Sequence, residues 1–229
     1  MESGKPTLHH LSDSQSQRIL WLLEELGIPY NLKLYARIDS GKDRSRAPPE
    51  LTAAHPLGKS PVLVTSDGRT IPESSAIAAY LLKTYDPAGR FQGDDWIRDE
   101  VLTSFAGSTL SGIIGIQLML DMMGGGTPIL LRPLVRVMTG GIDRAFVTPE
   151  LRKNMQCLET ELGDRDFFMG KEPGRADFML SWPFDLIEQR KWFDFAAYPK
   201  LQAWRTRCQD RPAWKSGLEK GNGYNLARF

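Results

Sequence analysis

Two clusters of hydroxyl and carboxyl side chains stand where helices are predicted to begin. Ser12, Asp13 and Ser14 precede a helical pattern, and Glu73 and Ser74 open a second one. The first turn of a helix has unpaired N–H groups and the positive end of the helix dipole, so it favours anions. A hydroxyl there adds a directed donor, and a carboxylate can hold an amino group. These residues are the first candidates for a functional site.

Each cluster also has an ordinary structural interpretation. Ser14 can be a plain N-cap, with Ser12 or Asp13 as other cap residues, because all three are common at that position. Glu73 can equally be a first-turn acid that complements the helix dipole. The residue types alone leave both interpretations open.

Metal chemistry is not expected. Cys157 and Cys208 lie far apart and outside any metal-binding spacing, and the chain has 3 His. His9 and His10 are adjacent on a predicted strand, so their side chains should point to opposite faces and not chelate together.

Composition limits the class of partner. The 229 residues contain 29 Lys and Arg against 28 Asp and Glu, a formal net charge of +1. Binding a phosphate lattice needs a clustered positive excess, so nucleic acid and anionic membranes are not expected partners. No apolar run of membrane-spanning length and no signal peptide are evident, and we expect a cytoplasmic protein.

The elements of the first third alternate between strand and helix. Strands are predicted at 7–11 and 30–35 around a helix at 15–26, a β-α-β unit with parallel strands. A short helix begins at Pro48-Pro49-Glu50. Strands 62–65 and 69–71 form a hairpin through Ser66-Asp67-Gly68-Arg69, because Asp-Gly favours that turn. A helix over 73–85 closes the series β-α-β-α-β-β-α.

Only helical patterns follow. A long helix is predicted from Asp94 to about Met123, then a break at Gly124–Pro128; the further helices are 129–138, 149–162, 177–189, 200–211 and 212–219. We therefore expect an α/β domain over 1–85, a linker over 86–93 and an all-α domain over 94–229.

Three strings in the first domain resemble the soluble glutathione transferases. They are Ser14-Gln15-Ser16-Gln17-Arg18 with the helix after it, His55-Pro56-Leu57-Gly58-Lys59-Ser60-Pro61, and Glu73-Ser74-Ser75-Ala76-Ile77. Three motifs in order are far more specific than one. The string Ala47-Pro48-Pro49-Glu50-Leu51 narrows the resemblance to serine-type members of the fungal and bacterial branch similar to yeast-type transferase I.

The resemblance implies a thioredoxin-like first domain and glutathione as co-substrate. Ser14, four residues before Arg18, holds the place of the thiolate-stabilising serine, with Ser16 as the main substitute. A free thiol has a pKa of about 8.5, so lowering it by about two units needs roughly 2.7 kcal/mol of differential stabilisation.

The resemblance also assigns the glutathione contacts. Glu73 and Ser74 would take the γ-glutamyl unit, and Ser60 would offer its backbone to the cysteinyl unit before a cis Pro61. Lys59 can hold the glycine carboxylate or be solvated.

The resemblance places the pocket for the second substrate between the first loop and the long helix, with Ser12, Phe105, Thr109, Ile113 and Met119 as candidates. A stripe of such residues on a helix more often belongs to the core, so this alternative stays open. Whether the break at Gly124–Pro128 opens or hinges this pocket stays open. Asp177 is interpreted as structural, in a helix-start motif whose usual hydroxyl residue is replaced by Gly174. Arg132 and Arg136 are interpreted as the basic edge of a packed helix rather than a membrane contact.

The expected function is conjugation of glutathione to a small hydrophobic electrophile, by a homodimer. Two alternatives remain. One is a glutathione-dependent cis-trans isomerase of secondary metabolism, in which thiolate addition to a conjugated alkene is reversed after rotation. The other is a non-enzymatic protein that binds glutathione or hydrophobic ligands.

Overall fold

A computed structural model describes residues 4–41, 45–93 and 95–227. The strands are β1 (Thr7–Leu11), β2 (Asn31–Tyr35), β3 (Val62–Val64) and β4 (Thr70–Pro72). The helices are α1 (Gln17–Leu26), α2 (Ser74–Tyr85), α3 (Trp96–Ser104), α4 (Ser111–Gly126), α5 (Arg132–Ile142), α6 (Thr148–Leu162), α7 (Arg175–Gln189), α8 (Pro199–Asp210) and α9 (Pro212–Lys220). Short 3-10 helices cover Pro49–Ala53 and Phe195–Ala197.

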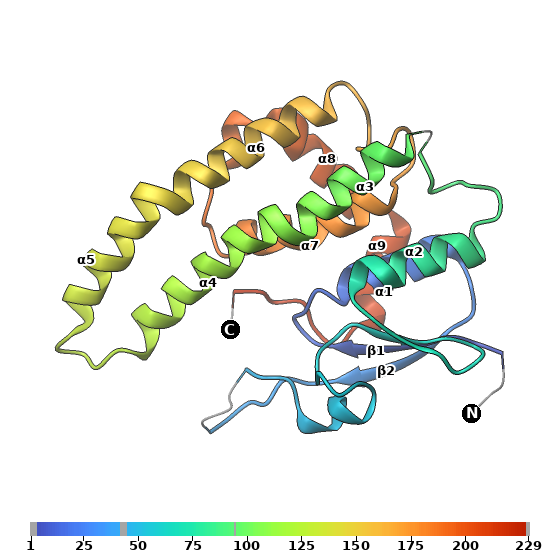
Figure 1. The fold of residues 1–229 in the computed structure, drawn as a ribbon, viewed down its shortest axis with the longest axis horizontal. Helices are drawn as coiled ribbons and strands as arrows, with labels where there is room; N and C mark the ends of the chain where they lie inside the picture. The colour runs from blue at the N-terminus through green and yellow to red at the C-terminus, as the bar shows by residue number, and fades with distance from the viewer. Residues whose placement is uncertain (1–3, 42–44, 94, 228–229) are drawn as a thin grey trace.

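The four strands form one mixed sheet in the order β2-β1-β3-β4. The β1 and β2 strands pair in parallel, with Leu8 opposite Leu32, and this confirms the predicted β-α-β unit. The β3–β4 hairpin adds antiparallel strands, with Leu8 opposite Leu63. Figure 1 shows α1 and α2 lying over the sheet. The predicted α/β unit is therefore present, with a 3-10 turn in place of the second helix.

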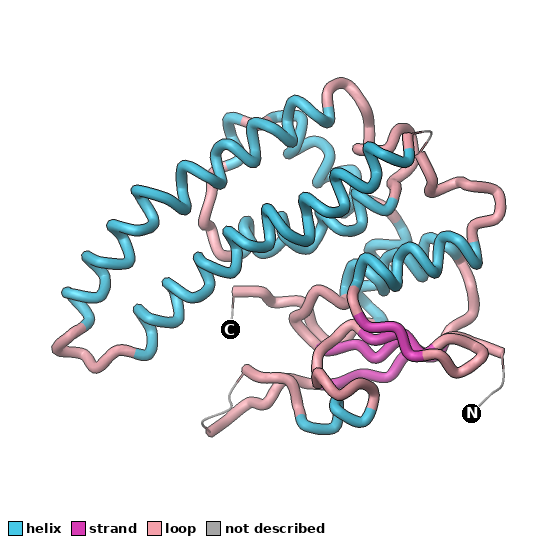
Figure 2. Tube along the Cα trace, viewed as in Figure 1, coloured by secondary structure: helices cyan, strands magenta, loops and turns pink. Residues whose placement is uncertain are grey.

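Beyond Pro72, the described residues contain helices and one isolated bridge between Phe167 and Gly170. The α3 and α4 helices run into each other through a π-helical stretch, Phe105–Leu110, and α5 continues into α6 through Asp143–Val147. Figures 1 and 2 show the far ends of α4 and α5 projecting from the body as a helical hairpin. This confirms the expected α/β-then-all-α architecture.

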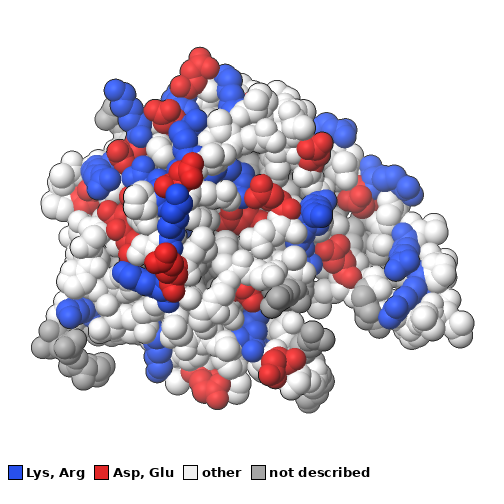
Figure 3. Space-filling model, turned by 180° about the vertical axis from the view of Figure 1, so that it is seen from behind, with Lys and Arg blue, Asp and Glu red and all other residues white. Residues whose placement is uncertain are grey.

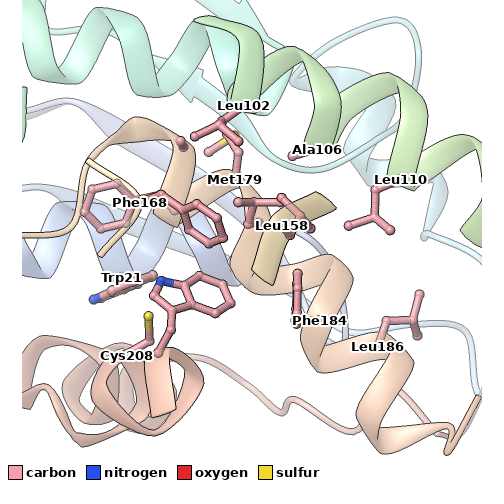
Figure 4. Close-up of a cluster of buried hydrophobic side chains, with 14 of the residues drawn as sticks. Trp21, Leu102, Ala106, Leu110, Leu158, Phe168, Met179, Phe184, Leu186 and Cys208 are labelled. Carbon is pink, nitrogen blue, oxygen red and sulfur yellow. The ribbon is translucent and has the colours of Figure 1, made fainter. Parts of the chain in front are cut away.

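The sequence suggested no segment of membrane-spanning length, but the continuous helix Trp96–Gly124 reaches that length. Its 29 residues, with a mean hydropathy of 1.4 in the most apolar window, make it long and apolar enough to cross a membrane by length and composition alone. In this fold Leu102, Ala106 and Leu110 of that helix are buried in the protein core (Figure 4). Within the apolar window 33% of the residues are buried, so one side of the helix packs in the core.

The core extends from the sheet into the helical part without a break. Trp21 of α1 meets Phe178 of α7 edge-on at 4.5 Å between ring centroids, and Trp214 of α9 at 5.0 Å. Phe184 and Phe168 pack on Trp204 in the same way. The α1 helix, which begins beside the candidate site, is thus anchored on both parts of the chain.

Asp177 holds the start of α7, as the structural interpretation predicted. Its Oδ1 accepts hydrogen bonds from Phe168 N at 2.9 Å and from Trp204 Nε1 at 2.8 Å. Its Oδ2 accepts from Gly174 N at 2.8 Å. Burial raises the pKa of Asp177 to about 6, and these hydrogen bonds counter that rise.

Two of the predicted helix ends lie elsewhere in the structure, and a third cannot be compared. The α1 helix begins at Gln17, so residues 14–16 remain in the preceding loop. The α4 helix continues through Gly126, and Thr127 ends it. The predicted helix start at Asp94 lies outside the described residues.

Charged side chains are interspersed over the surface. In Figure 3, basic and acidic groups alternate over much of one face of the molecule. Arg205 pairs with Asp185 in the interior at 2.8 Å. The mixed pattern agrees with the near-zero net charge and offers no extended basic face in that view.

Candidate active site

A cavity of about 590 Å³ lies where the first part of the chain meets the helices of the second. On one side it is lined by the loop before α1 and by the start of α2. On the other side it is lined by the α3–α4 helix and by Met179 and Trp182 of α7. A smaller cavity of about 30 Å³ adjoins it, lined by the segment from His55 to Val62. Gln15, Lys59, Glu73 and Ser74 line both, so the two cavities form one continuous site.

Ser14 lies in the loop between β1 and α1 and is 5% exposed. Its hydroxyl donates to Leu11 O at 2.7 Å, and its Oγ accepts from Ser16 N at 3.2 Å. The preceding residue, Asp13, has a φ of 52°, the left-handed region that Asp tolerates better than most residues. Ser14 is not a lining residue of either cavity, but the next residue, Gln15, lines both.

Arg37 and the C-terminal segment hold this loop. The Arg37 guanidinium donates to Ser12 O at 3.1 Å and to Asp13 O at 2.8 Å. Asp13 N donates to Gly223 O at 3.1 Å, and Asn225 N donates to the Asp13 carboxylate at 2.5 Å. The loop conformation is therefore set by contacts with residues far away in the sequence.

Ser16 and Ser12 do not face the cavities. Ser16 is fully buried, with its Oγ 3.1 Å from His10 Nδ1. Burial lowers the pKa of His10 to about 4, so this histidine is neutral at pH 7. The Ser12 Oγ accepts from Arg37 N at 3.2 Å. Neither residue lines either cavity, so this geometry gives no support to Ser16 as the substitute catalytic residue or to Ser12 as a pocket residue.

Glu73 and Ser74 stand at the start of α2, as predicted. Glu73 is exposed and adopts φ 68° and ψ 119°, an unfavourable backbone region for a non-glycine residue. Ser74 is buried, and its Oγ accepts from the Arg18 guanidinium at 3.0 Å. A carboxylate and a hydroxyl are thus held side by side at a helix N-terminus that faces the cavities.

The segment before β3 supplies the floor of the smaller cavity. Ser60 and Pro61 line it, and their peptide bond is cis, as the resemblance implied. Ser60 Oγ donates to His9 O at 2.9 Å and accepts from Leu11 N at 3.0 Å. Ser60 is therefore tied to β1 through its side chain. Lys59 is exposed at the junction of the two cavities.

The helical wall of the larger cavity differs from the one predicted. Ile113 is buried in the core, and Phe105 is partly buried and packs against the same core. Thr109 and Met119 are exposed. The wall is instead formed by Thr103, Gly107, Ser111 and Gly115, with Ile114 and Leu118. Phe105, Thr109 and Ile113 each lie two residues from a small lining residue, and because two residues turn an α-helix by about 200°, these three face away from the cavity. Met119 lies just beyond the lining residue Leu118. The repeated small residues at every fourth position were the signal for the correct face.

Arg18 is the main site residue whose environment the sequence did not show. It lines the larger cavity and is 6% exposed. Its guanidinium donates to Met179 O at 2.9 Å, to Ser74 Oγ and to Gln15 Oε1. Burial lowers the pKa of Arg18 to about 10, which still leaves it charged at pH 7. A buried positive charge thus lies behind the residues that line the junction.

Comparisons with known proteins agree with this arrangement. Residues 14–84 match the family described as glutathione S-transferase, N-terminal domain, and residues 142–212 match the glutathione S-transferase C-terminal domain. The chain is 34% identical to glutathione S-transferase 3 of Schizosaccharomyces pombe over 225 residues, which cover 97% of the chain and 90% of that protein. It is 28% identical to glutathione S-transferase 1 of Saccharomyces cerevisiae, covering 93% and 94%.

Solved structures give the same result. A glutathione S-transferase from Actinobacillus pleuropneumoniae superposes with a TM-score of 0.73 at 30% identity, over 98% of this chain and 96% of that one. A sphingomonad glutathione S-transferase in complex with glutathione has the same fold, with a TM-score of 0.65 at 21% identity over 93% and 97% of the two chains. The α/β part is therefore thioredoxin-like, and the rest is the helical domain that accompanies it in these proteins.

Proposed function

The chain belongs to the glutathione S-transferase family and uses glutathione as co-substrate, and we propose that its site converts the glutathione thiol to a thiolate that attacks a small hydrophobic electrophile. The observation that carries this proposal is the pair of joined cavities. The smaller one, with Ser60, Glu73 and Ser74, presents polar groups that suit the amino group and backbone of a peptide lying across the site. The larger one, with Ile114, Leu118 and Met179, fits an apolar molecule.

We assign a different role to each domain. Residues 1–85 would bind glutathione, residues 94–229 would complete the pocket for the second substrate, and residues 86–93 would connect them. Glu73 and Ser74 would hold the γ-glutamyl unit, Ser60 would pair with the cysteinyl backbone, and Lys59 would attract the glycine carboxylate. In the reaction, the thiolate sulfur forms a bond to an electrophilic carbon, and a halide leaves or an enolate takes up a proton. We further propose a cytoplasmic location.

Labelled glutathione tests this proposal against its alternatives. The protein is incubated with glutathione and a panel of activated halides, enones and conjugated cis and trans alkenes, and the products are analysed by mass. Conjugation consumes one glutathione per turnover, and we expect an adduct. A product with the substrate's mass, changed geometry and no loss of glutathione would establish the isomerase. Bound glutathione without any reaction would favour the binding protein.

Replacing Ser14 with Ala should raise the pKa of the bound glutathione thiol by one or more units, at about 1.4 kcal/mol per unit, because a hydroxyl donor near the sulfur is lost. Glutathione affinity should change little. The measurement is thiolate absorbance of the complex against pH. Ser12→Ala is the matched control, since the Ser12 hydroxyl contacts Arg37 N, and it should leave the thiol pKa unchanged. An unshifted thiol pKa in Ser14→Ala would exclude Ser14 as a sulfur contact.

We also propose a homodimer, with the first domain of one chain against the second domain of its mate. The support is a set of exposed apolar side chains on α3, where Trp96 is 73% exposed and Val101 is 60% exposed. Such side chains in one region favour an interface. Light scattering at micromolar concentration should give twice 25.8 kDa, and Val101→Glu should lower that mass. A monomer mass for the unmodified protein would refute the dimer.

A further inference from the structure

We propose that Gln15 is a catalytic residue of this site, whose side-chain amide N–H donates a hydrogen bond to the glutathione sulfur. This inference rests on the proposed function, because it assumes that the two joined cavities hold glutathione and its electrophile. It adds a sulfur contact that the residue pattern of the sequence did not single out. Gln15 stays in the loop only because α1 begins two residues later than predicted.

We place the sulfur beside the loop that carries Ser14, the residue proposed to contact it. One ligand contributes the sulfur and the other contributes the carbon that it attacks, and reacting atoms must approach to about 3–3.5 Å. Lining both cavities does not by itself place the sulfur, because Lys59 and Glu73, which would hold opposite ends of glutathione, also line both. Gln15, Lys59, Glu73 and Ser74 line both cavities, and Gln15 comes from the loop that also carries Ser14.

Arg18 fixes which way the Gln15 amide points. A guanidinium has only N–H donors, so the atom that it meets must be the amide oxygen. Gln15 Oε1 accepts from Arg18, and the amide nitrogen is therefore the end directed away from it. Within the described residues no acceptor for Gln15 Nε2 is found, and this atom is not among the unpaired nitrogens buried from solvent. It is thus an accessible donor on a residue that lines the junction.

The same contact makes Gln15 a stronger donor. Arg18 is buried and positively charged, and no ion pair to a carboxylate is present for it in the part of the chain that the structure describes. Hydrogen bonds in a chain polarise one another, and a cation on the amide oxygen draws electron density from the nitrogen. An anion such as a thiolate gains most from a donor of this kind. Arg18 would act here as a positioning residue.

The hydroxyl proton of Ser14 is already engaged in a hydrogen bond, so a second donor to the sulfur would add to the stabilisation of the thiolate. Its hydroxyl proton is directed to Leu11 O at 2.7 Å, so donation to the sulfur requires that contact to be exchanged. The Gln15 amide gives up no protein contact in order to donate. We therefore expect Gln15 to carry a share of the thiolate stabilisation that is independent of Ser14.

Two substitutions of Gln15 distinguish the role of its amide N–H donor from the role of the side chain's size and its contact with Arg18. Gln15→Met keeps the length of the side chain and removes the amide. Gln15→Glu keeps an oxygen for Arg18 and replaces the N–H donor with a carboxylate oxygen, with almost no change in shape. Gln202→Met, at an exposed position of α8, is the matched control. Thiolate absorbance against pH gives the thiol pKa, and calorimetry with S-methylglutathione, which has no thiol, measures binding alone.

We expect Gln15→Met to raise the pKa of the bound thiol by about one unit and to lower kcat/KM about tenfold at pH below that pKa. Gln15→Glu should raise the pKa further, because like charges repel. Binding of S-methylglutathione to Gln15→Met should stay within roughly threefold of the unmodified protein. The Gln202→Met variant should match the unmodified protein throughout.

Two results would overturn the inference. One is an unchanged thiol pKa in both Gln15 variants. The other is weaker S-methylglutathione binding with an unchanged thiol pKa, which would make Gln15 a contact of the peptide and not of the sulfur. Failure of the proposed function looks different, because then the unmodified protein itself would not lower the pKa of bound glutathione.

Discussion

Replacing Glu73 with Ala should weaken glutathione binding by about 1.5–3 kcal/mol, the range of a hydrogen bond to a charged group. This corresponds to roughly a 10- to 150-fold rise in Kd. The reason is that the Glu73 carboxylate lines both cavities beside Ser74 and would hold the amino group of the γ-glutamyl unit. Calorimetry with glutathione measures the loss directly.

Glu73→Gln separates charge from shape in this experiment. The amide keeps an acceptor and the side-chain length, and both replacements meet the same backbone requirement, since Glu73 has a φ of 68°. We expect Glu73→Gln to lose less affinity than Glu73→Ala, while the thiol pKa of the complex changes less in either variant than in Ser14→Ala. Unchanged affinity in Glu73→Ala would show that Glu73 is only a first-turn acid.

Asp177→Ala should lower the free energy of unfolding by on the order of 3 kcal/mol or more. The change leaves three buried donors without an acceptor, namely Phe168 N, Gly174 N and Trp204 Nε1. Each unsatisfied buried donor costs about 1–3 kcal/mol. Urea unfolding gives the difference, and the exposed carboxylate Asp166 provides a control in Asp166→Ala, which should stay within about 0.5 kcal/mol.

The loss of stability caused by Asp177→Ala should also depend on pH, and it should become smaller as the pH rises. Burial raises the pKa of Asp177 to about 6, above its ordinary value of 3.8. Between these values the folded protein binds a proton that the unfolded chain does not, so the contribution of Asp177 falls as pH rises. The difference between the protein and Asp177→Ala should therefore shrink from pH 4 to pH 6. A difference that grows over this range would mean that the hydrogen bonds outweigh burial and depress the pKa.

Elements with strong local patterns were predictable from the sequence. The β-α-β unit and the Asp67-Gly68 hairpin follow from short-range alternation and turn chemistry, and both are present at the expected residues. Glu73 and Ser74 were placed correctly because a strand followed by a helix start fixes them within a few residues. These predictions needed no information from distant parts of the chain.

The details of the site depend on contacts between residues far apart in the sequence. The loop that carries Ser14 and Gln15 is held by Arg37 and by the segment around Gly223, and no local pattern encodes those contacts. This is why the start of α1 was misplaced by two residues and Gln15 was overlooked. The burial of Arg18 likewise depends on Met179 of α7.

The wall of the larger cavity was mispredicted for a different reason. Large apolar side chains such as Ile113 were assigned to the pocket, although in this helix they fill the core. A cavity needs space, and space is left by the small residues Gly107, Ser111 and Gly115. Apolar periodicity identifies the face that packs, and the complementary small-residue face is the one that lines the site.

The most direct measurement of the central claim is the pKa of the glutathione thiol when it is bound to the unmodified protein, read from thiolate absorbance across a pH series. An unperturbed thiol titrates near 8.5. We expect a value about two units lower, because donors from the Ser14–Gln15 loop and the buried charge of Arg18 favour the anion. A bound thiol that titrates like free glutathione would contradict the account and leave a protein that holds glutathione without activating it.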